Sequence, residues 1–150
     1  MSKSVLFLCT GNYYRSRFAE ILFNHLARKE KLPWRAHSRG LQVGMHELVG
    51  SISPYTIARM KRLRIDCETA SREPSQCTKA DLESADIVIA VKEAEHRRML
   101  AEKFAGWEKR VRFWNVHDLD GATPDVALAE LETLVGDLVE ELSKSAAKVK

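Results

Sequence analysis

The stretch that decides the fold joins an apolar run, a polar loop and an amphipathic pattern. It reads Val5-Leu6-Phe7-Leu8-Cys9-Thr10-Gly11-Asn12-Tyr13-Tyr14-Arg15-Ser16 and continues with apolar residues at Phe18, Ile21, Leu22 and Leu26. An unbroken apolar run of this length is typical of a strand buried on both faces of a parallel sheet. The helical spacing after Ser16 predicts a helix directly behind the loop. Strand, tight loop and helix in this order indicate the start of an α/β unit.

The rest of the chain repeats this alternation. Strands are predicted at residues 34–38, 87–91 and 111–116, and helices at residues 54–64, 93–104 and from 124 onward. Strands that alternate with helices predict an α/β fold with a parallel sheet flanked by helices on both faces. We expect residues 1–150 to form a single domain in which residues 143–150 are a frayed tail.

Composition excludes several classes of protein. The 150 residues are 45% hydrophobic and 30% charged, with a net charge of +3. No apolar run approaches the roughly 20 residues of a membrane-spanning helix, and the N-terminal run is too short for a signal peptide. The three cysteines and the histidines lack disulfide or metal-ligand spacing. We therefore expect a cytoplasmic protein with no metal, membrane or nucleic-acid partner.

The loop after the first predicted strand carries the pattern Cys-x5-Arg-Ser, from Cys9 to Ser16. Ligands of parallel sheets bind at the carboxyl ends of strands, and the amides of a following helix N-terminus attract anions. Gly11 is expected to let the loop backbone curl around one oxyanion. Arg15 then adds a bidentate fork to two phosphoryl oxygens, and the positive surroundings favour the reactive thiolate of Cys9. The alternative is that Cys9 merely ends a buried strand.

Residues 5–20 resemble the opening of the low-molecular-weight protein-tyrosine phosphatases, and the similarity extends over the whole chain. Further matches are Ser38-Arg39-Gly40 and, more loosely, residues 85–88 and 114–118. The resemblance implies a four-stranded parallel sheet and cofactor-free hydrolysis through a phosphocysteine. It makes Cys9 the nucleophile and Arg15 the phosphoryl-binding residue. The remaining loop residues would surround the substrate: Thr10, Gly11, Asn12, Tyr13, Tyr14 and Ser16.

The resemblance also implies a general acid after the fourth strand, where this chain has Asp118. In the family a proline usually follows this aspartate, whereas this chain reads Asp118-Leu119-Asp120, so Asp120 is a competing candidate. If Asp118 is the acid, Asp118→Ala slows the turnover of aryl phosphates far more than Asp120→Ala. In the alternative, Asp118 only ends a strand and Asp120 begins a turn.

Other departures from the family concern the substrate and the loop. Tyr14 stands where many members have a second cysteine, and Lys92 where they often have an acidic residue. Aromatic residues that line the family's cleft are missing from their usual places, and we expect Tyr13 and Tyr14 to replace them by stacking on an aryl ring. Arg72 aligns loosely with a position that braces the phosphate loop in relatives.

Two other functions stay open beside that of a phosphatase. A pseudophosphatase would keep the loop and bind phosphate or phosphopeptides without turnover. An arsenate reductase would need two more cysteines after the third strand, whereas Cys67 and Cys77 precede that strand. The sequence favours a monomeric phosphatase whose substrate is a phosphorylated protein or a small aryl phosphate.

Overall fold

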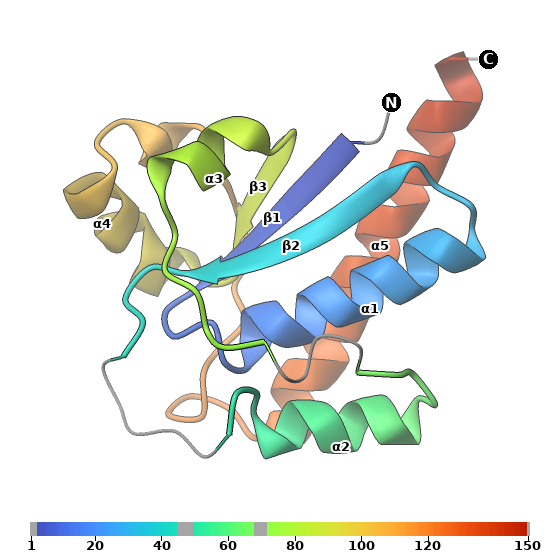
Figure 1. Cartoon of the computed structure of the whole chain (residues 1–150), viewed down its shortest axis with the longest axis horizontal. Coiled ribbons are helices and arrows are strands. Elements are labelled where there is room, and N and C mark those ends of the chain that lie inside the picture. The colour runs from blue at the N-terminus through green and yellow to red at the C-terminus, as the bar shows by residue number, and fades with distance from the viewer. Residues whose placement is uncertain (1–2, 45–49, 68–71, 150) are drawn as a thin grey trace.

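The computed structural model describes residues 3–44, 50–67 and 72–149. Its central layer is a four-stranded, wholly parallel sheet with the strand order β2-β1-β3-β4 (Figure 1). The strands are β1 (Lys3–Cys9), β2 (Trp34–Gly40), β3 (Ile87–Ala90) and β4 (Arg112–Phe113). The helices are α1 (Arg15–Lys29), α2 (Pro54–Arg62), α3 (Lys79–Ser84), α4 (Glu93–Lys103), α5 (Pro124–Val149) and the short 3-10 helix η1 (Trp107–Lys109). The predicted α/β architecture is confirmed.

The alternation of side chains along β1 creates two cores. Val5 and Phe7 point into the core shared with α1 and α5, whereas Leu6 and Leu8 belong to the core that includes α3 and α4. Figure 1 shows α1 and α5 on one side of the sheet and α3 and α4 on the other. Because β1 is covered on both faces, every residue of its apolar run is buried, as the sequence predicts.

Local signals in the sequence set several helix ends. Ser53 caps α2 by accepting a hydrogen bond from the Tyr55 amide at 3.2 Å, and Pro54 follows as the first helical residue. Thr78 and Asp81 form a reciprocal capping box at the start of α3. The last helix, α5, includes most of the segment 143–150. The fraying of this segment and the single-domain organisation stay predictions.

The fourth strand is shorter than the predicted range 111–116. Only Arg112 and Phe113 pair with β3 as a regular parallel ladder. Beyond them the chain stays bound to the end of β3, since the Val116 amide donates to the Val91 carbonyl at 2.7 Å. This course carries the chain across the carboxyl ends of the strands and brings residues 116–120 to the edge where β1 also ends.

The carboxyl ends of the three longer strands meet at one edge of the sheet. Cys9 at the end of β1 is paired with Gly40 at the end of β2, and Leu8 is paired with Ala90 at the end of β3. This edge is therefore the expected place for a ligand. Across the described ranges, no helix has the length and apolar content needed to cross a membrane.

Candidate active site

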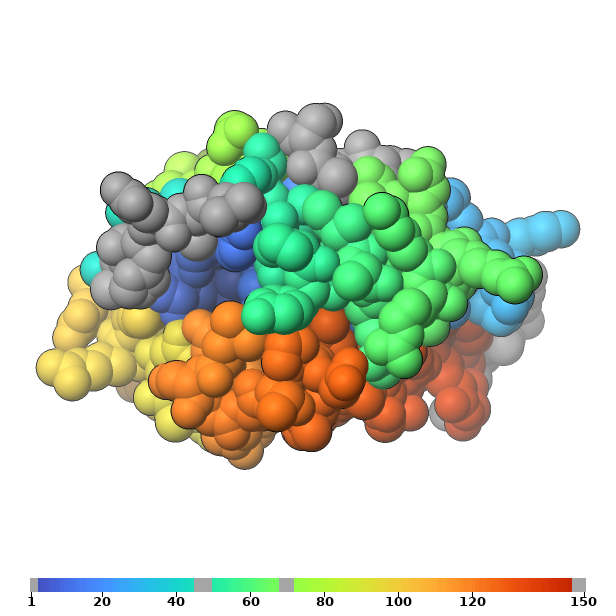
Figure 2. Space-filling view, turned by 90° about the horizontal axis from the view of Figure 1, so that it is seen from below, coloured from blue at the N-terminus to red at the C-terminus, as the bar shows by residue number. Residues whose placement is uncertain are grey.

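A cavity of about 600 Å³ opens at this edge. Its floor is the loop between β1 and α1, and its walls come from the start of α2, the first turns of α4 and the segment after β4. Figure 2 shows this hollow from below, with the blue N-terminal residues visible between the green start of α2 and the orange segment after β4. Cys9, Arg15, Asp118 and Asp120 all line it, so the structure brings these sequence-predicted residues together.

Cys9 lies at the base of the cavity and is 3% exposed. Its sulfur is 2.9 Å from the Ser16 hydroxyl. Its carbonyl accepts a hydrogen bond from the Leu41 amide at 2.9 Å, which fixes the end of β1 to the residue after β2. The sulfur is thus held in one place and has a hydroxyl partner able to donate to a thiolate.

Asn12 is the residue at which the loop backbone turns. It has a φ of 53°, in the left-handed region, whereas Gly11 is not among the positive-φ residues. The left-handed residue of the loop is therefore Asn12, a residue type that tolerates this conformation, and the role of Gly11 in curling the loop around an anion stays a prediction. The left-handed conformation of Asn12 is stabilised by the hydrogen bonds of its side-chain amide.

The amide of Asn12 has all its hydrogen-bonding capacity filled. Nδ2 donates to the hydroxyls of Ser16 at 3.0 Å and Ser38 at 2.9 Å. Oδ1 accepts from the Ser75 amide at 3.0 Å and from Arg72 at 3.2 Å. Both N–H groups of this buried amide donate and its oxygen accepts two hydrogen bonds, so the side chain fixes the conformation of the loop.

Arg72 braces this network from outside the loop, as its loose alignment with relatives suggests. Besides Asn12 it donates to Glu20 and to the Ser38 hydroxyl, both at 3.1 Å. Glu20 is 5% exposed and also accepts from Ser38, so its negative charge is compensated by Arg72. The loop is therefore tied to α1, β2 and the segment before α3.

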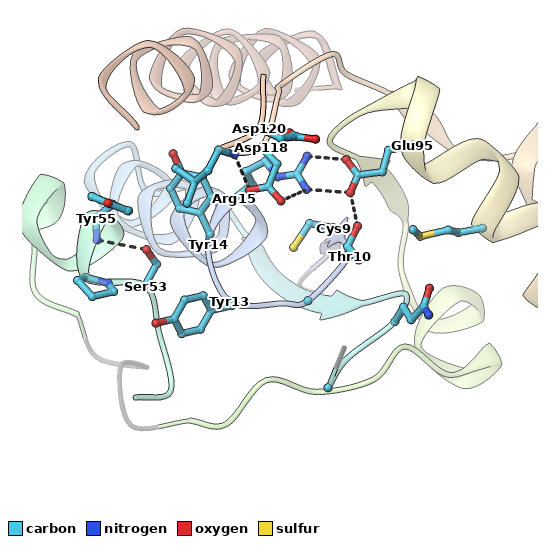
Figure 3. Close-up of a pocket in the computed structure, with 16 residues that line it drawn as sticks. Cys9, Thr10, Tyr13, Tyr14, Arg15, Ser53, Tyr55, Glu95, Asp118 and Asp120 are labelled. Carbon is cyan, nitrogen blue, oxygen red and sulfur yellow. Dashed lines mark hydrogen bonds and ion pairs between the residues drawn. The ribbon is translucent and has the colours of Figure 1, made fainter. Parts of the chain in front are cut away.

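Arg15 lies beside Cys9 and is surrounded by acceptors (Figure 3). Its Nη1 donates to Glu95 Oε2 at 3.2 Å and to the Val116 carbonyl at 3.0 Å. Its Nη2 donates to Glu95 Oε1 at 3.1 Å and lies 3.5 Å from Asp118 Oδ2. Burial alone would lower the pKa of Arg15, but the Cys9 sulfur, Glu95 and Asp118 together raise that pKa above its ordinary value.

Sequence reasoning missed Glu95. It treats Lys92 as the replacement for an acidic residue common in the family, whereas the structure supplies a carboxylate from Glu95, one turn later in α4. Glu95 also accepts a hydrogen bond from the Thr10 hydroxyl. The available signal was an acidic residue in the first turn of the helix after the third strand, where a side chain is aimed at the carboxyl edge of the sheet.

The aromatic side chains of the cavity differ from the prediction in one respect. Tyr13 and Tyr14 both line the cavity, but Tyr14 is only 6% exposed. Its ring packs edge-on against Tyr55 at a centroid distance of 6.3 Å, and burial and Asp118 raise the pKa of its hydroxyl to about 12. Tyr55, which the sequence analysis did not single out, is 49% exposed and forms a wall of the same cavity.

The two candidate aspartates are distinguished by their contacts. Asp118 forms an ion pair with Arg15 and accepts a hydrogen bond from the Leu119 amide at 2.9 Å. Asp120 lines the cavity but makes no contact with Arg15 among the interactions of the described residues. The geometry therefore favours Asp118 as the carboxylate closer to a group bound at Arg15.

Comparison with known proteins agrees with this arrangement. The sequence model of the low molecular weight phosphotyrosine protein phosphatase family matches residues 4–148. The chain is 28% identical to the protein-arginine-phosphatase of Bacillus subtilis over 152 aligned positions, which cover 93% of this chain and 97% of the relative.

Solved structures give the same result. The low molecular weight protein tyrosine phosphatase of T. tengcongensis superimposes with a TM-score of 0.78 at 26% identity, covering 93% of this chain and 99% of that one. An arginine phosphatase from Geobacillus stearothermophilus has a TM-score of 0.76 at 27% identity, covering 97% and 96%. A mutant arginine phosphatase with a phosphorylated active-site serine has a TM-score of 0.77 at 27% identity, covering 94% and 96%. The chain therefore belongs to the low molecular weight phosphotyrosine protein phosphatase family.

Proposed function

We propose that this phosphatase hydrolyses phosphotyrosine or other aryl phosphate monoesters, with Cys9 as the nucleophile. The observation that carries the proposal is the convergence of the Cys9 sulfur, the Arg15 guanidinium and the Asp118 carboxylate on one cavity. The three groups are a nucleophile, a binding group for phosphoryl oxygens and a proton donor, which are the parts that phosphoryl transfer through a covalent intermediate requires.

In the first step the Cys9 thiolate attacks phosphorus. An S–P bond forms as the bond from phosphorus to the phenolic oxygen breaks, and Asp118 gives its proton to that oxygen. Amides of the loop and Arg15 hold the three other phosphoryl oxygens, whose charge they stabilise in the transition state. The phosphorylated active-site serine in a mutant arginine phosphatase of similar structure supports an intermediate of this kind.

In the second step water replaces the cysteine. Asp118, now ionised, accepts a proton from the attacking water, an O–P bond forms, and the S–P bond breaks to release phosphate. The departing sulfur again becomes a thiolate next to the Ser16 hydroxyl at 2.9 Å. Asn12 holds that hydroxyl at 3.0 Å, so the hydrogen-bond donor to the leaving thiolate is fixed before the reaction starts.

The aryl group of the substrate would lie between aromatic and aliphatic walls. Tyr13 and Tyr55 line one side of the cavity, and Leu119, which is 52% exposed, lies next to Asp118. A planar ring gains both apolar burial and aromatic packing between such side chains. This supports an aryl ester over a small alkyl phosphate.

A second candidate substrate is phosphoarginine in proteins. Two observations favour it: the Bacillus subtilis relative is a protein-arginine-phosphatase, and among the described residues carboxylates from Glu95, Asp118 and Asp120 line the cavity. A guanidinium leaving group carries positive charge, which these carboxylates would attract. The nucleophile and Arg15 would have the same roles in this reaction.

The test measures hydrolysis of p-nitrophenyl phosphate by the wild type and Cys9→Ser in reducing buffer. A second assay compares the hydrolysis of two peptides of one sequence, one with phosphotyrosine and one with phosphoarginine. We expect turnover by the wild type, none by Cys9→Ser, and preference for the phosphotyrosine peptide. Preference for the other peptide would identify the second candidate. No turnover, together with a higher melting temperature in phosphate, would indicate a phosphate-binding protein. Arsenate-dependent oxidation of thiols would indicate a reductase.

A further inference from the structure

The Arg15 guanidinium has five N–H groups, and the structure accounts for four of them. Nη1 donates to Glu95 and to the Val116 carbonyl, and Nη2 donates to Glu95 and faces Asp118. Glu95 therefore occupies the end of the guanidinium, between its two terminal nitrogens. Among the contacts of the described residues, none is made by Nε. The edge formed by Nε and Nη2 can therefore bind a bidentate ligand. Among the described residues, Asp118 is the one that contacts this edge, at Nη2.

Glu95 is itself held by an ordered chain of hydrogen bonds. The Lys92 amide donates to Nδ1 of His96 at 3.2 Å, so Nδ1 is an acceptor and the imidazole hydrogen lies on Nε2. Nε2 is 3.1 Å from the Thr10 hydroxyl, which donates in turn to Glu95 Oε1. Nε2 also lies 3.4 Å from Glu95 Oε1, so the contacts of His96 and Thr10 converge on the Glu95 carboxylate.

The surroundings of this chain keep Glu95 ionised and His96 neutral. Burial alone would raise the pKa of Glu95, but hydrogen bonds from His96, Arg15 and Thr10 outweigh it and hold the pKa well below its usual range. His96 is fully buried, and this burial lowers its pKa despite the neighbouring Glu95. A carboxylate with this many donors is costly to displace.

Asp118 is held far less firmly than Glu95. Its side chain is 44% exposed and reaches Arg15 through one contact of 3.5 Å, whereas the Glu95 side chain is 24% exposed and accepts two bonds from Arg15. Of the two carboxylates, Asp118 is therefore the one that an incoming phosphoryl dianion would displace more readily from Arg15.

We propose that Glu95 is a positioning residue: it binds the end of the Arg15 guanidinium and thereby reserves the Nε and Nη2 edge for the phosphoryl group, which displaces Asp118. The proposal rests on the proposed function, since it concerns how the same site binds its substrate. The opposite role is also testable, because a carboxylate that occupied the phosphoryl position itself would compete with phosphate. Removal of its charge would then strengthen phosphate binding.

The test compares Glu95→Gln with Glu93→Gln. Both glutamates lie in the first turn of α4, and Glu93 pairs with Arg97 at the surface, so the two variants lose the same charge at the same helix end. Orthovanadate and inorganic phosphate are titrated by calorimetry, together with kcat/KM for p-nitrophenyl phosphate and the melting temperature. Bound vanadate resembles the five-coordinate transition state, whereas phosphate resembles a ground state.

We expect Glu95→Gln to lower kcat/KM and vanadate affinity by the same factor of about 10 to 100, the value of one or two charge-assisted hydrogen bonds. Phosphate affinity should fall by a smaller factor, and Glu93→Gln should change each quantity by less than about twofold. If Glu95→Gln is poorly folded, Glu95→Asp is used. This variant keeps the charge but withdraws the carboxylate by one methylene, and the same loss of vanadate affinity is expected.

Unchanged vanadate affinity in a folded Glu95 variant, or stronger phosphate binding, would overturn the positioning role. A loss in melting temperature without a change in the ratio of vanadate to phosphate affinity would also overturn it, since that is the result of a purely structural role. If the wild type lacks turnover, the proposed function fails, but the two titrations still decide the role of Glu95.

Discussion

Among single side chains, Asp118 is the one whose removal should have opposite effects on binding and on turnover. Its carboxylate lies 3.5 Å from Nη2 of Arg15 and repels a phosphate dianion that approaches the same nitrogen. Asp118→Asn keeps the shape and removes the charge. We expect phosphate affinity at neutral pH to rise by about fivefold, a modest value because the side chain is solvent-screened. Turnover of aryl phosphates should fall by roughly 100-fold or more, as for loss of a general acid.

Asp120→Asn is the matched control for this measurement. Asp120 lines the same cavity without an ion pair to Arg15 in the part of the chain that the structure describes. Phosphate affinity, measured by calorimetry, and turnover should therefore stay within about twofold of the wild type. A larger loss of turnover in Asp120→Asn than in Asp118→Asn would identify Asp120 as the acid instead.

The sequence displays the residues of the Cys9–Ser16 motif directly and supplies Asp118 through the family resemblance, but it did not predict Glu95 or Tyr55. Cys9 and Arg15 share a loop, and an apolar strand before them indicates where the loop lies. Glu95 is 80 residues away from Arg15 and meets it through the pairing of β1 with β3. Its register on α4 decides whether it points at Arg15 or at solvent, and the family pattern directed attention to Lys92 instead.

Among the secondary-structure elements, the end of β2 limits the shape of the anion-binding loop. A Cβ atom at Gly40 would lie 2.8 Å from the Thr10 carbonyl oxygen and 3.0 Å from the Asn12 amide nitrogen. Both are backbone atoms of the loop, so Gly40→Ala must push the loop away from β2. We expect a loss of about 1–3 kcal/mol in the free energy of unfolding, as for overpacking. Turnover should fall by more than tenfold, because small displacements of a binding loop are costly.

Gly136→Ala provides the control for this substitution. Gly136 lies within α5, and a Cβ atom there meets nothing within 4 Å. Because glycine is a poor helix former, this variant should gain about 0.5–1 kcal/mol of stability and keep wild-type turnover. Denaturant unfolding and kcat/KM measure both effects. A fully active Gly40→Ala would show that the loop tolerates displacement and would contradict the close fit described above.

The elements themselves were largely predictable, and their irregular parts were not. The apolar run of β1 and the capping residues of α2 and α3 are local features that the sequence displays directly. The shortness of β4 depends on how far β3 extends beside it, since only Ile89 and Ala90 pair with this strand. The left-handed conformation of Asn12 depends on partners as distant as Ser75. Neither property follows from the local sequence alone.

For the molecule as a whole, the buried chain from His96 to Glu95 predicts a loss of stability on acidification. His96 takes up a proton near its ordinary pKa of 6.5 in the unfolded chain, whereas burial lowers its pKa in the folded chain. Below about pH 6.5 the unfolded state therefore binds more protons, and the free energy of unfolding falls by up to about 1.4 kcal/mol per pH unit. Glu95 adds a second loss below its ordinary pKa of 4.5, because its folded-state pKa is also lowered.

Urea unfolding at a series of pH values measures this dependence, and His96→Gln tests its source. The variant should be less stable than the wild type at neutral pH, because it loses the hydrogen bonds that His96 makes with the Lys92 amide and the Thr10 hydroxyl. Glutamine also cannot take up a proton in this pH range. Between neutral pH and about pH 5, however, its free energy of unfolding should fall less steeply than that of the wild type. His25→Gln, on α1 outside this chain of bonds, should retain the wild-type slope. Equal slopes in His96→Gln and the wild type would mean that the pKa of His96 is not lowered by folding. The assignment of a neutral His96 imidazole beside Thr10 and Glu95 would then be wrong.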